Sequence, residues 1–203
     1  MDLLVRGGVL VVPILFCSVL AAAIFTERCI RFFLLRKRGL GVADRVSGLV
    51  MQGDRRAALE LASGSRSPMG RILKSALGVV DQDREILETV INHAAEEEVR
   101  GLSRYLQTLA TIANVTPILG LLGTVIGMIK AFMAIQDMGG KVNASVLAGG
   151  IWEALLTTAL GLSVALPVMV AHSYLLGRVD KYEAGLQSGA VLFMKSLGRS
   201  ARD

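Results

Sequence analysis

The chain has 203 residues, of which 53% are hydrophobic and 19% are charged, and its formal net charge is +5. Soluble domains average about 45–50% apolar and about 25% charged residues, so this composition argues against an ordinary soluble domain. The two cysteines, Cys17 and Cys29, lie too far apart along one predicted helix to bond each other, which excludes a disulfide framework.

Three long stretches of the chain carry almost no charge: residues 9–25, 109–135 and 146–174. Each is close to or above the roughly 20 residues that cross a bilayer as a helix. The first stretch could be a signal peptide, but its amino end is not basic and no small-residue cleavage site follows it. The sequence therefore predicts an all-α integral membrane protein with three transmembrane helices, the first of which is retained.

Basic residues gather beside these stretches. Of the 22 Lys and Arg residues, 14 fall within residues 28–104 and five lie from residue 178 onward. The positive-inside rule places both regions in the cytoplasm, and this topology accounts for the basic charge, so nucleic-acid binding is not expected. The predicted division is an outer amino terminus with the first span in 1–26, a cytoplasmic helical region in 27–108, a second span in 109–136, an outer turn in 137–145, a third span in 146–175 and a cytoplasmic helical tail in 176–203.

The cytoplasmic region is predicted to consist of short helices. Apolar residues recur at helical spacing in residues 40–52, and a second helix over 55–62 follows a Gly-Asp break. Pro68 is well placed to open a third helix at its first turn.

Two of the three spanning helices are predicted to extend into the cytoplasm. From Asp83 the helical pattern runs into the second span, and one continuous helix over 83–135 would be about 80 Å long. The third span is likewise expected to continue inward through Phe193.

One carboxylate, Glu153, lies within the third uncharged stretch. A charged side chain at membrane depth costs about 2.5–3.5 kcal/mol even on lenient scales, so an ion pathway is the default hypothesis. Thr157 shares a helix face with Glu153, Thr158 adjoins that face, and Thr124 offers a hydroxyl from the second span at similar depth. Hydroxyls pass a proton or orient water but hold no charge. Either Glu153 carries the proton, or a partner helix brings the carboxylate and the threonines line its path.

Lys130 is a second charged residue within the spans. It could pair with Glu153 across helices, or its ammonium could reach the outer interface, which is the favoured interpretation. His93 and His172 have no ligand spacing around them, and the sequence holds no nucleophile–base pair or phosphate loop. Neither a metal, a cofactor nor an enzymatic activity is therefore expected.

Small residues recur in the second and third spans, at spacings that let helix backbones approach closely. The positions expected to serve in helix packing are Gly120, Gly123, Gly127 and Gly161. A three-span monomer offers too little protein surface for so many packing positions, so a homo-oligomer is expected. Pro117 and Pro167 lie near the inner ends of these spans and are predicted to kink the helices, either as hinges or only as architecture.

Two segments of the sequence resemble the core of the ExbB/TolQ/MotA family of proton-channel stator subunits. The first comprises residues 109–114 and 117–128, and the second comprises residues 147–162 with Leu166-Pro167. The Gly-Asp helix start and the Ser-Pro turn of the cytoplasmic region are similar to the ExbB branch, so the resemblance covers most of the chain. Three spans favour ExbB or TolQ over the four-span flagellar type. Departures from the family pattern are Thr116, Trp152 and Lys130.

The resemblance implies a homopentamer in the bacterial inner membrane, with the amino terminus in the periplasm and the carboxyl terminus in the cytoplasm. Its pore would hold the spans of two ExbD- or TolR-like subunits, whose membrane Asp carries the proton. Thr124 and Thr158 would line the route, and Glu153 would be a supporting polar residue. Proton-motive force would then drive rotation, and a periplasm-spanning protein like TonB or TolA would transmit the work to the outer membrane for transport.

Alternative functions are a TolQ-like role in envelope integrity or division, or a gliding-motor stator. A different class is a non-conducting membrane scaffold, for which polar-to-apolar changes at these positions would be tolerated. An intramembrane hydrolase lacks the necessary nucleophile and base. The sequence alone does not name the client of such a motor.

Overall fold

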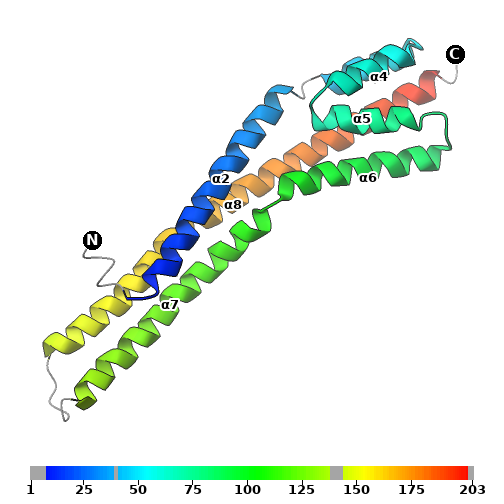
Figure 1. The fold of residues 1–203 in the computed structure, drawn as a ribbon. Coiled ribbons are helices and arrows are strands. Elements are labelled where there is room, and N and C mark those ends of the chain that lie inside the picture. The colour runs from blue at the N-terminus through cyan, green and yellow to red at the C-terminus, as the bar shows by residue number, and fades with distance from the viewer. Residues whose placement is uncertain (1–7, 39–40, 138–143, 201–203) are drawn as a thin grey trace. The chain divides into compact units, whose positions relative to one another are not determined.

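The computed structural model describes residues 8–38, 41–137 and 144–200, and every regular element in them is a helix (Figure 1). In chain order the helices are α2 (Val11–Arg38), α3 (Val42–Met51), α4 (Arg55–Gly64), α5 (Pro68–Gly78), α6 (Arg84–Ser103), α7 (Leu106–Asp137) and α8 (Ala144–Ser200). The predicted all-α class is confirmed. The expected outer turn at 137–145 lies largely outside the described residues.

Three helical stretches are long and apolar enough to cross a membrane: Val11–Leu35, Arg84–Asp137 and Leu147–Gly198. The chain divides into two compact units. Met1–Glu27 and Tyr105–Tyr174 form one, here called the membrane unit, and Arg28–Arg104 and Leu175–Asp203 form the other, here called the helical unit. Each unit thus joins residues that are distant in sequence.

The helical unit is built around an aliphatic core. Its most buried members include Val46, Ile72, Leu73, Ala76 and Phe193, contributed by α3, α5 and α8. Removing this apolar surface from water is the main favourable contribution to folding of such a unit.

The short helices of the helical unit start where the sequence predicts. The Asp54 carboxylate accepts a hydrogen bond from the Ala57 amide at 3.0 Å, and the Ser67 hydroxyl accepts one from the Gly70 amide at 3.1 Å. Each acceptor satisfies an amide that has no partner within its own helix. Pro68 occupies the first turn of α5.

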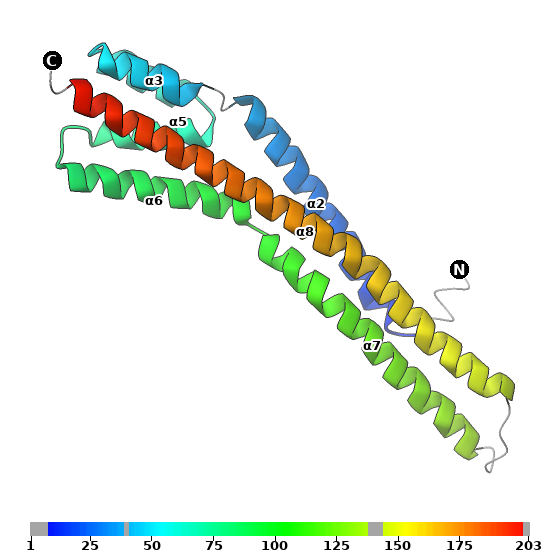
Figure 2. The same cartoon turned by 180° about the vertical axis from the view of Figure 1, so that it is seen from behind.

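The prediction of one continuous helix over 83–135 is wrong. α6 ends at Ser103 and α7 begins at Leu106, because Tyr105 adopts a left-handed conformation with φ 67°. Figure 2 shows the two ribbons joined by a short link. Apolar periodicity persists on both sides of this break, so the pattern alone did not indicate it.

Arg28 of α2 stabilises the end of α6. Its side chain is only 1% exposed, and its Nη1 donates hydrogen bonds to the carbonyls of Gly101 and Leu102 at 3.1 and 3.3 Å. In an uninterrupted helix these carbonyls would accept from the amides of residues 105 and 106. The guanidinium replaces those donors, so the break leaves neither carbonyl unsatisfied.

The prediction that the third spanning helix continues past residue 175 is confirmed, whereas the cytoplasmic location of that continuation stays a prediction. α8 is a single helix of 57 residues, about 85 Å at 1.5 Å per residue, and Figure 2 shows it as one uninterrupted ribbon. Pro167 lies inside α8 and Pro117 inside α7, and each helix continues past its proline. Kinking at these residues stays a prediction.

Candidate functional site

Glycines of α7 lie directly against α8 in the membrane unit. A Cβ added at Gly120 would lie 3.1 Å from the Thr158 Cα, and one added at Gly127 would lie 2.9 Å from the Ala154 Cβ. At Gly123 an added Cβ would collide with the Thr157 side chain. Any larger residue would therefore force the two backbones apart.

The contact continues from the α8 side. A Cβ at Gly161 would lie 2.9 Å from the Thr116 carbonyl oxygen and 3.1 Å from the Gly120 Cα. Gly150, one of the small residues of the third span, has the same restriction, with the Ala131 Cβ at 2.6 Å. Small residues on both helices thus bring the backbones of α7 and α8 together, as expected where lipid supplies no hydrophobic force between helices.

Glu153 pairs with Lys130 across this contact. The Lys130 Nζ lies 3.0 Å from the Glu153 Oε1, so the structure shows the pairing alternative rather than the interfacial lysine favoured from the sequence. The side chains are 53% and 29% exposed, respectively. The ion pair joins α7 to α8 within apolar helices, where an unpartnered charge would be costly.

Gly8 also borders the Glu153 carboxylate, a contact that the sequence analysis missed. Its φ is 68°, a conformation that residues with a Cβ rarely adopt, and an added Cβ would collide with Oε1 of Glu153. The backbone before α2 therefore approaches the ion pair closely because residue 8 has no side chain. No motif or spacing in the sequence indicated that Gly8 would lie beside Glu153.

The hydroxyls of the three candidate threonines donate to backbone carbonyls. Thr158 donates across the helix contact to Gly120 at 2.8 Å, whereas Thr124 donates to Leu121 at 2.6 Å within its own helix. Thr157 donates to Ala154 at 2.7 Å. A hydroxyl oxygen that donates its hydrogen still has lone pairs to accept from water or a proton donor.

Burial distinguishes the three threonines. Thr157 is 2% exposed, since it fills the space above Gly123, whereas Thr124 and Thr158 remain partly accessible. The structure therefore brings Glu153, Thr157 and Thr158 together on α8, but it places Thr157 inside the α7–α8 contact.

Large apolar side chains cover the outer faces of the spanning helices. Those more than half exposed include Val12, Phe16 and Val19 on α2, Ile118, Leu121 and Phe132 on α7, and Trp152, Leu155, Leu166 and Val170 on α8. Such surface is far larger than a soluble monomer tolerates and fits contact with lipid or with other membrane helices. Within the described residues, no group of three His, Cys, Asp or Glu side chains could hold a metal ion.

Comparisons with known proteins identify the family. The profile of the MotA/TolQ/ExbB proton channel family matches residues 64–188, more than half of the chain. A biopolymer transport protein ExbB homolog of Methanothermobacter thermautotrophicus is 34% identical over 68% of this chain, which spans 49% of that relative.

Two further relatives come from bacteria. The biopolymer transport protein ExbB of Salmonella typhimurium is 28% identical, covering 91% of this chain and 80% of its own length. The Tol-Pal system protein TolQ of Haemophilus influenzae is 42% identical, covering 46% of this chain and 40% of its own length. With its three apolar helices, its polar cluster at the α7–α8 contact and these matches, the chain belongs to the MotA/TolQ/ExbB proton channel family.

Proposed function

We propose that this chain is a proton-driven motor subunit of an ExbB–ExbD–TonB-like complex, which conducts protons together with a single-span partner and transmits mechanical energy to the outer membrane for transport. The observation that carries the proposal is the Glu153–Lys130 ion pair together with the Thr158 hydroxyl at the contact of two otherwise apolar helices. An ionisable side chain in such a place marks an ion pathway by default.

The Lys130 contact bears on which group carries the proton. The Lys130 Nζ lies 3.0 Å from the Glu153 Oε1, so Glu153 already has a partner of opposite charge within this chain. A proton carrier must move between partners in each cycle. We therefore adopt the alternative in which a partner helix supplies the moving carboxylate, and Glu153 supports the path beside it.

The threonines take different parts in this proposal. Thr124 and Thr158 retain exposed surface and acceptor lone pairs, so they line the route. Thr157 is buried against Gly123 and acts by holding α7 and α8 in contact. Pro117 and Pro167 remain candidate hinges within these helices.

The proposed assembly is a homopentamer in the bacterial inner membrane, with its amino terminus in the periplasm and its carboxyl terminus in the cytoplasm. Its partners are a dimer of ExbD- or TolR-like subunits in the pore and a TonB- or TolA-like protein that spans the periplasm. The exposed apolar side chains of α2, α7 and α8 support contacts with other helices and lipid. The basic residues in 28–104 and after 178 support the orientation.

A TolQ-like role is the second candidate. The TolQ relative has the higher identity, 42%, but its match covers less than half of this chain. The ExbB relative matches across 91% of the chain, so the helical unit as well as the spans is similar to that branch. This difference in coverage favours the ExbB-like role.

Proton flux into vesicles tests the proposal. The chain is purified with its native single-span partner, reconstituted and energised by a pH gradient. Thr158→Val and Glu153→Gln are expected to lower the flux by about 100-fold, the typical contribution of a positioned proton-transfer group. Thr111→Val is the control, because this exposed hydroxyl donates within its own helix, to the Gln107 carbonyl, whereas the Thr158 hydroxyl donates across the α7–α8 contact.

Mass spectrometry of the purified complex shows whether the single-span partner is bound to each variant. Wild-type flux in both Thr158→Val and Glu153→Gln, with the partner still bound, would contradict the roles proposed for these residues, whereas absence of flux in the wild-type complex would favour the non-conducting scaffold. Loss of flux in Thr111→Val as well would show that the changes act through folding.

A further inference from the structure

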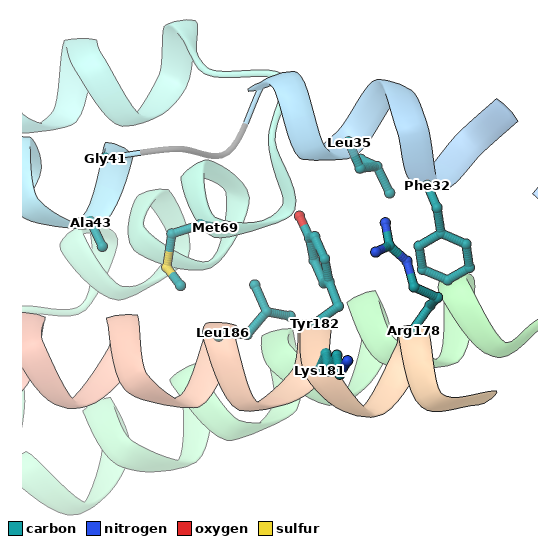
Figure 3. A pocket seen from close by; sticks show the side chains of 10 residues that line it. Phe32, Leu35, Gly41, Ala43, Met69, Arg178, Lys181, Tyr182 and Leu186 are labelled. Atoms are coloured by element: carbon teal, nitrogen blue, oxygen red, sulfur yellow. The ribbon is translucent and has the colours of Figure 1, made fainter. Parts of the chain in front are cut away.

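The helical unit contains a cavity of about 310 Å³ where the end of α2 faces α8 (Figure 3). Its apolar lining includes Phe32 and Leu35 of α2, Met69 of α5 and Leu186 of α8. Phe32, Met69 and Leu186 are each less than 9% exposed, so these walls belong to the packed unit. The volume exceeds many times the space needed by one water molecule, and the apolar walls offer water few hydrogen bonds.

Two cations line the same cavity. Figure 3 shows Arg178 extending from α8 toward Phe32 and Leu35, and Lys181 leaving the same helix nearby. The carboxylates of Asp180 and Glu183, their neighbours in sequence, are not part of the lining. The cavity thus combines an apolar interior with a positively charged edge.

Tyr182 adds a polar group between the cations and the walls. Burial, followed by the nearby Glu98 carboxylate, raises the pKa of its phenol above the ordinary value. The phenol stays neutral at physiological pH and keeps a hydrogen to donate. It therefore supplements Arg178 and Lys181 as a partner for an anionic oxygen.

The cavity lies where two apolar stretches end. Along α2, Leu35 is the last residue of the candidate span Val11–Leu35. Along α8, Arg178 is the first Lys or Arg after the uncharged stretch 146–174. Such helix positions coincide with the headgroup region of a bilayer, and the positive-inside rule assigns them to the cytoplasmic leaflet, which is rich in anionic lipids.

We propose that this cavity binds one anionic phospholipid. The phosphate lies between Arg178 and Lys181, and part of an acyl chain occupies the space beside Phe32, Met69 and Leu186. The first turn of α3 adds to the attraction, because Gly41 and Ala43 border the cavity and the helix start has no side-chain cap. Lipid binding at this site does not depend on proton conduction, so it can be tested separately from the proposed function.

The chemistry of the walls distinguishes this ligand from free phosphate. An inorganic anion would use Arg178 and Lys181 but would gain nothing from the apolar surface. A phospholipid uses both, because each methylene of its chain that is buried against the walls adds to the affinity.

One variant removes the charges. Arg178→Gln with Lys181→Gln is expected to weaken binding of phosphatidylglycerol by about 30-fold, since each basic residue near an anionic surface contributes a factor of about five. Lys74→Gln with Lys195→Gln is the control, because it removes two cations from the helical unit outside this cavity.

A second variant fills the space. Gly185 lines the cavity, and a Cβ there would meet no atom within 4 Å, so Gly185→Leu places a side chain in the cavity without displacing backbone. Gly177→Leu is its control on the same helix, also with open space around the added Cβ and outside the lining. Only the first is expected to exclude the acyl chain.

Native mass spectrometry of the full-length chain, stripped of lipid in mild detergent, measures the result. Phosphatidylglycerol is expected to bind at one molecule per chain, more tightly than phosphatidylcholine, with losses in Arg178→Gln/Lys181→Gln and in Gly185→Leu only. Equal binding of both lipids, or unchanged binding in both variants, would overturn the proposal. So would displacement of phosphatidylglycerol by millimolar inorganic phosphate, which would indicate an anion site alone. If the double variant does not fold, as judged by circular dichroism, the comparison of Gly185→Leu with Gly177→Leu decides.

Discussion

Different kinds of contact stabilise the two units of this chain internally. In the helical unit, large side chains such as Phe193 and Ile72 are fully buried, and α4 and α5 carry side-chain caps. In the membrane unit, glycines bring α7 and α8 to backbone contact, and a threonine hydroxyl bonds a carbonyl of the other helix. In water, apolar burial drives packing, whereas among lipids close fit and polar bonds must do so. We therefore expect smaller side chains to destabilise the core of the helical unit, and larger side chains to destabilise the α7–α8 contact of the membrane unit.

The largest expected effect is removal of a side chain from the helical unit. Phe193→Ala should destabilise this unit by about 3–5 kcal/mol, because it deletes apolar contacts and leaves a cavity. Chemical denaturation followed by circular dichroism measures the loss. Leu192→Ala, at a side chain 38% exposed on the same helix, should cost far less. Equal losses would mean that burial does not set the stability of this unit.

The next effect comes from adding a side chain to the membrane unit. Gly123→Val should separate α7 from α8 at Thr157 and cost about 1–3 kcal/mol, the usual range for overpacking. Thermal unfolding in detergent gives the size of the change. Gly149→Val is the control, since a Cβ at Gly149 meets no atom within 4 Å. A stable Gly123→Val protein with a destabilised Gly149→Val protein would contradict the assigned contact.

These two kinds of contact explain what the sequence could predict. Amphipathic periodicity and capping residues indicated the short helices of the helical unit, because polar residues there lie on the exposed helix faces and apolar residues on the buried ones. In the spans both faces are apolar, so periodicity does not reveal which face meets protein. Small-residue spacing indicated Gly120, Gly123, Gly127 and Gly161, but it did not distinguish Gly150, which meets Ala131, from Gly149, which meets no atom within 4 Å.

Residues that act through tertiary contacts were the hardest to assign. Arg28 was interpreted as part of a topology signal, yet it is buried and bonds the end of α6. Its two acceptor carbonyls lie 73 and 74 residues away in sequence, and no local pattern connects them. For the same reason the left-handed Tyr105 went unpredicted.

A smaller effect is expected from the ion pair of the membrane unit. Lys130→Met leaves Glu153 without its counter-charge, and the coupling between the two residues should be about 0.5–1.5 kcal/mol, as for polar contacts between membrane helices. A double-mutant cycle with Glu153→Gln measures this coupling by thermal unfolding. Lys130→Arg is the control, because it keeps the charge. Additive losses, with no coupling, would mean that the pair does not form in the membrane.

The smallest expected effect is a loss of stability at alkaline pH that arises from Tyr182 in the helical unit. Its pKa in the folded chain is raised, chiefly by burial, so above about pH 10 the unfolded chain releases this proton more readily than the folded one. The associated stability is fully present below that pH and is lost as the pH rises toward the folded-state value, at no more than about 1.4 kcal/mol per pH unit. Tyr182→Phe should remove this slope, whereas Tyr174→Phe, at an exposed ring, should keep it. Denaturant titrations between pH 8 and pH 11 (roughly one unit or more on either side of the ordinary tyrosine pKa) measure it, and an unchanged slope in Tyr182→Phe would show that the phenol is solvated in the folded helical unit.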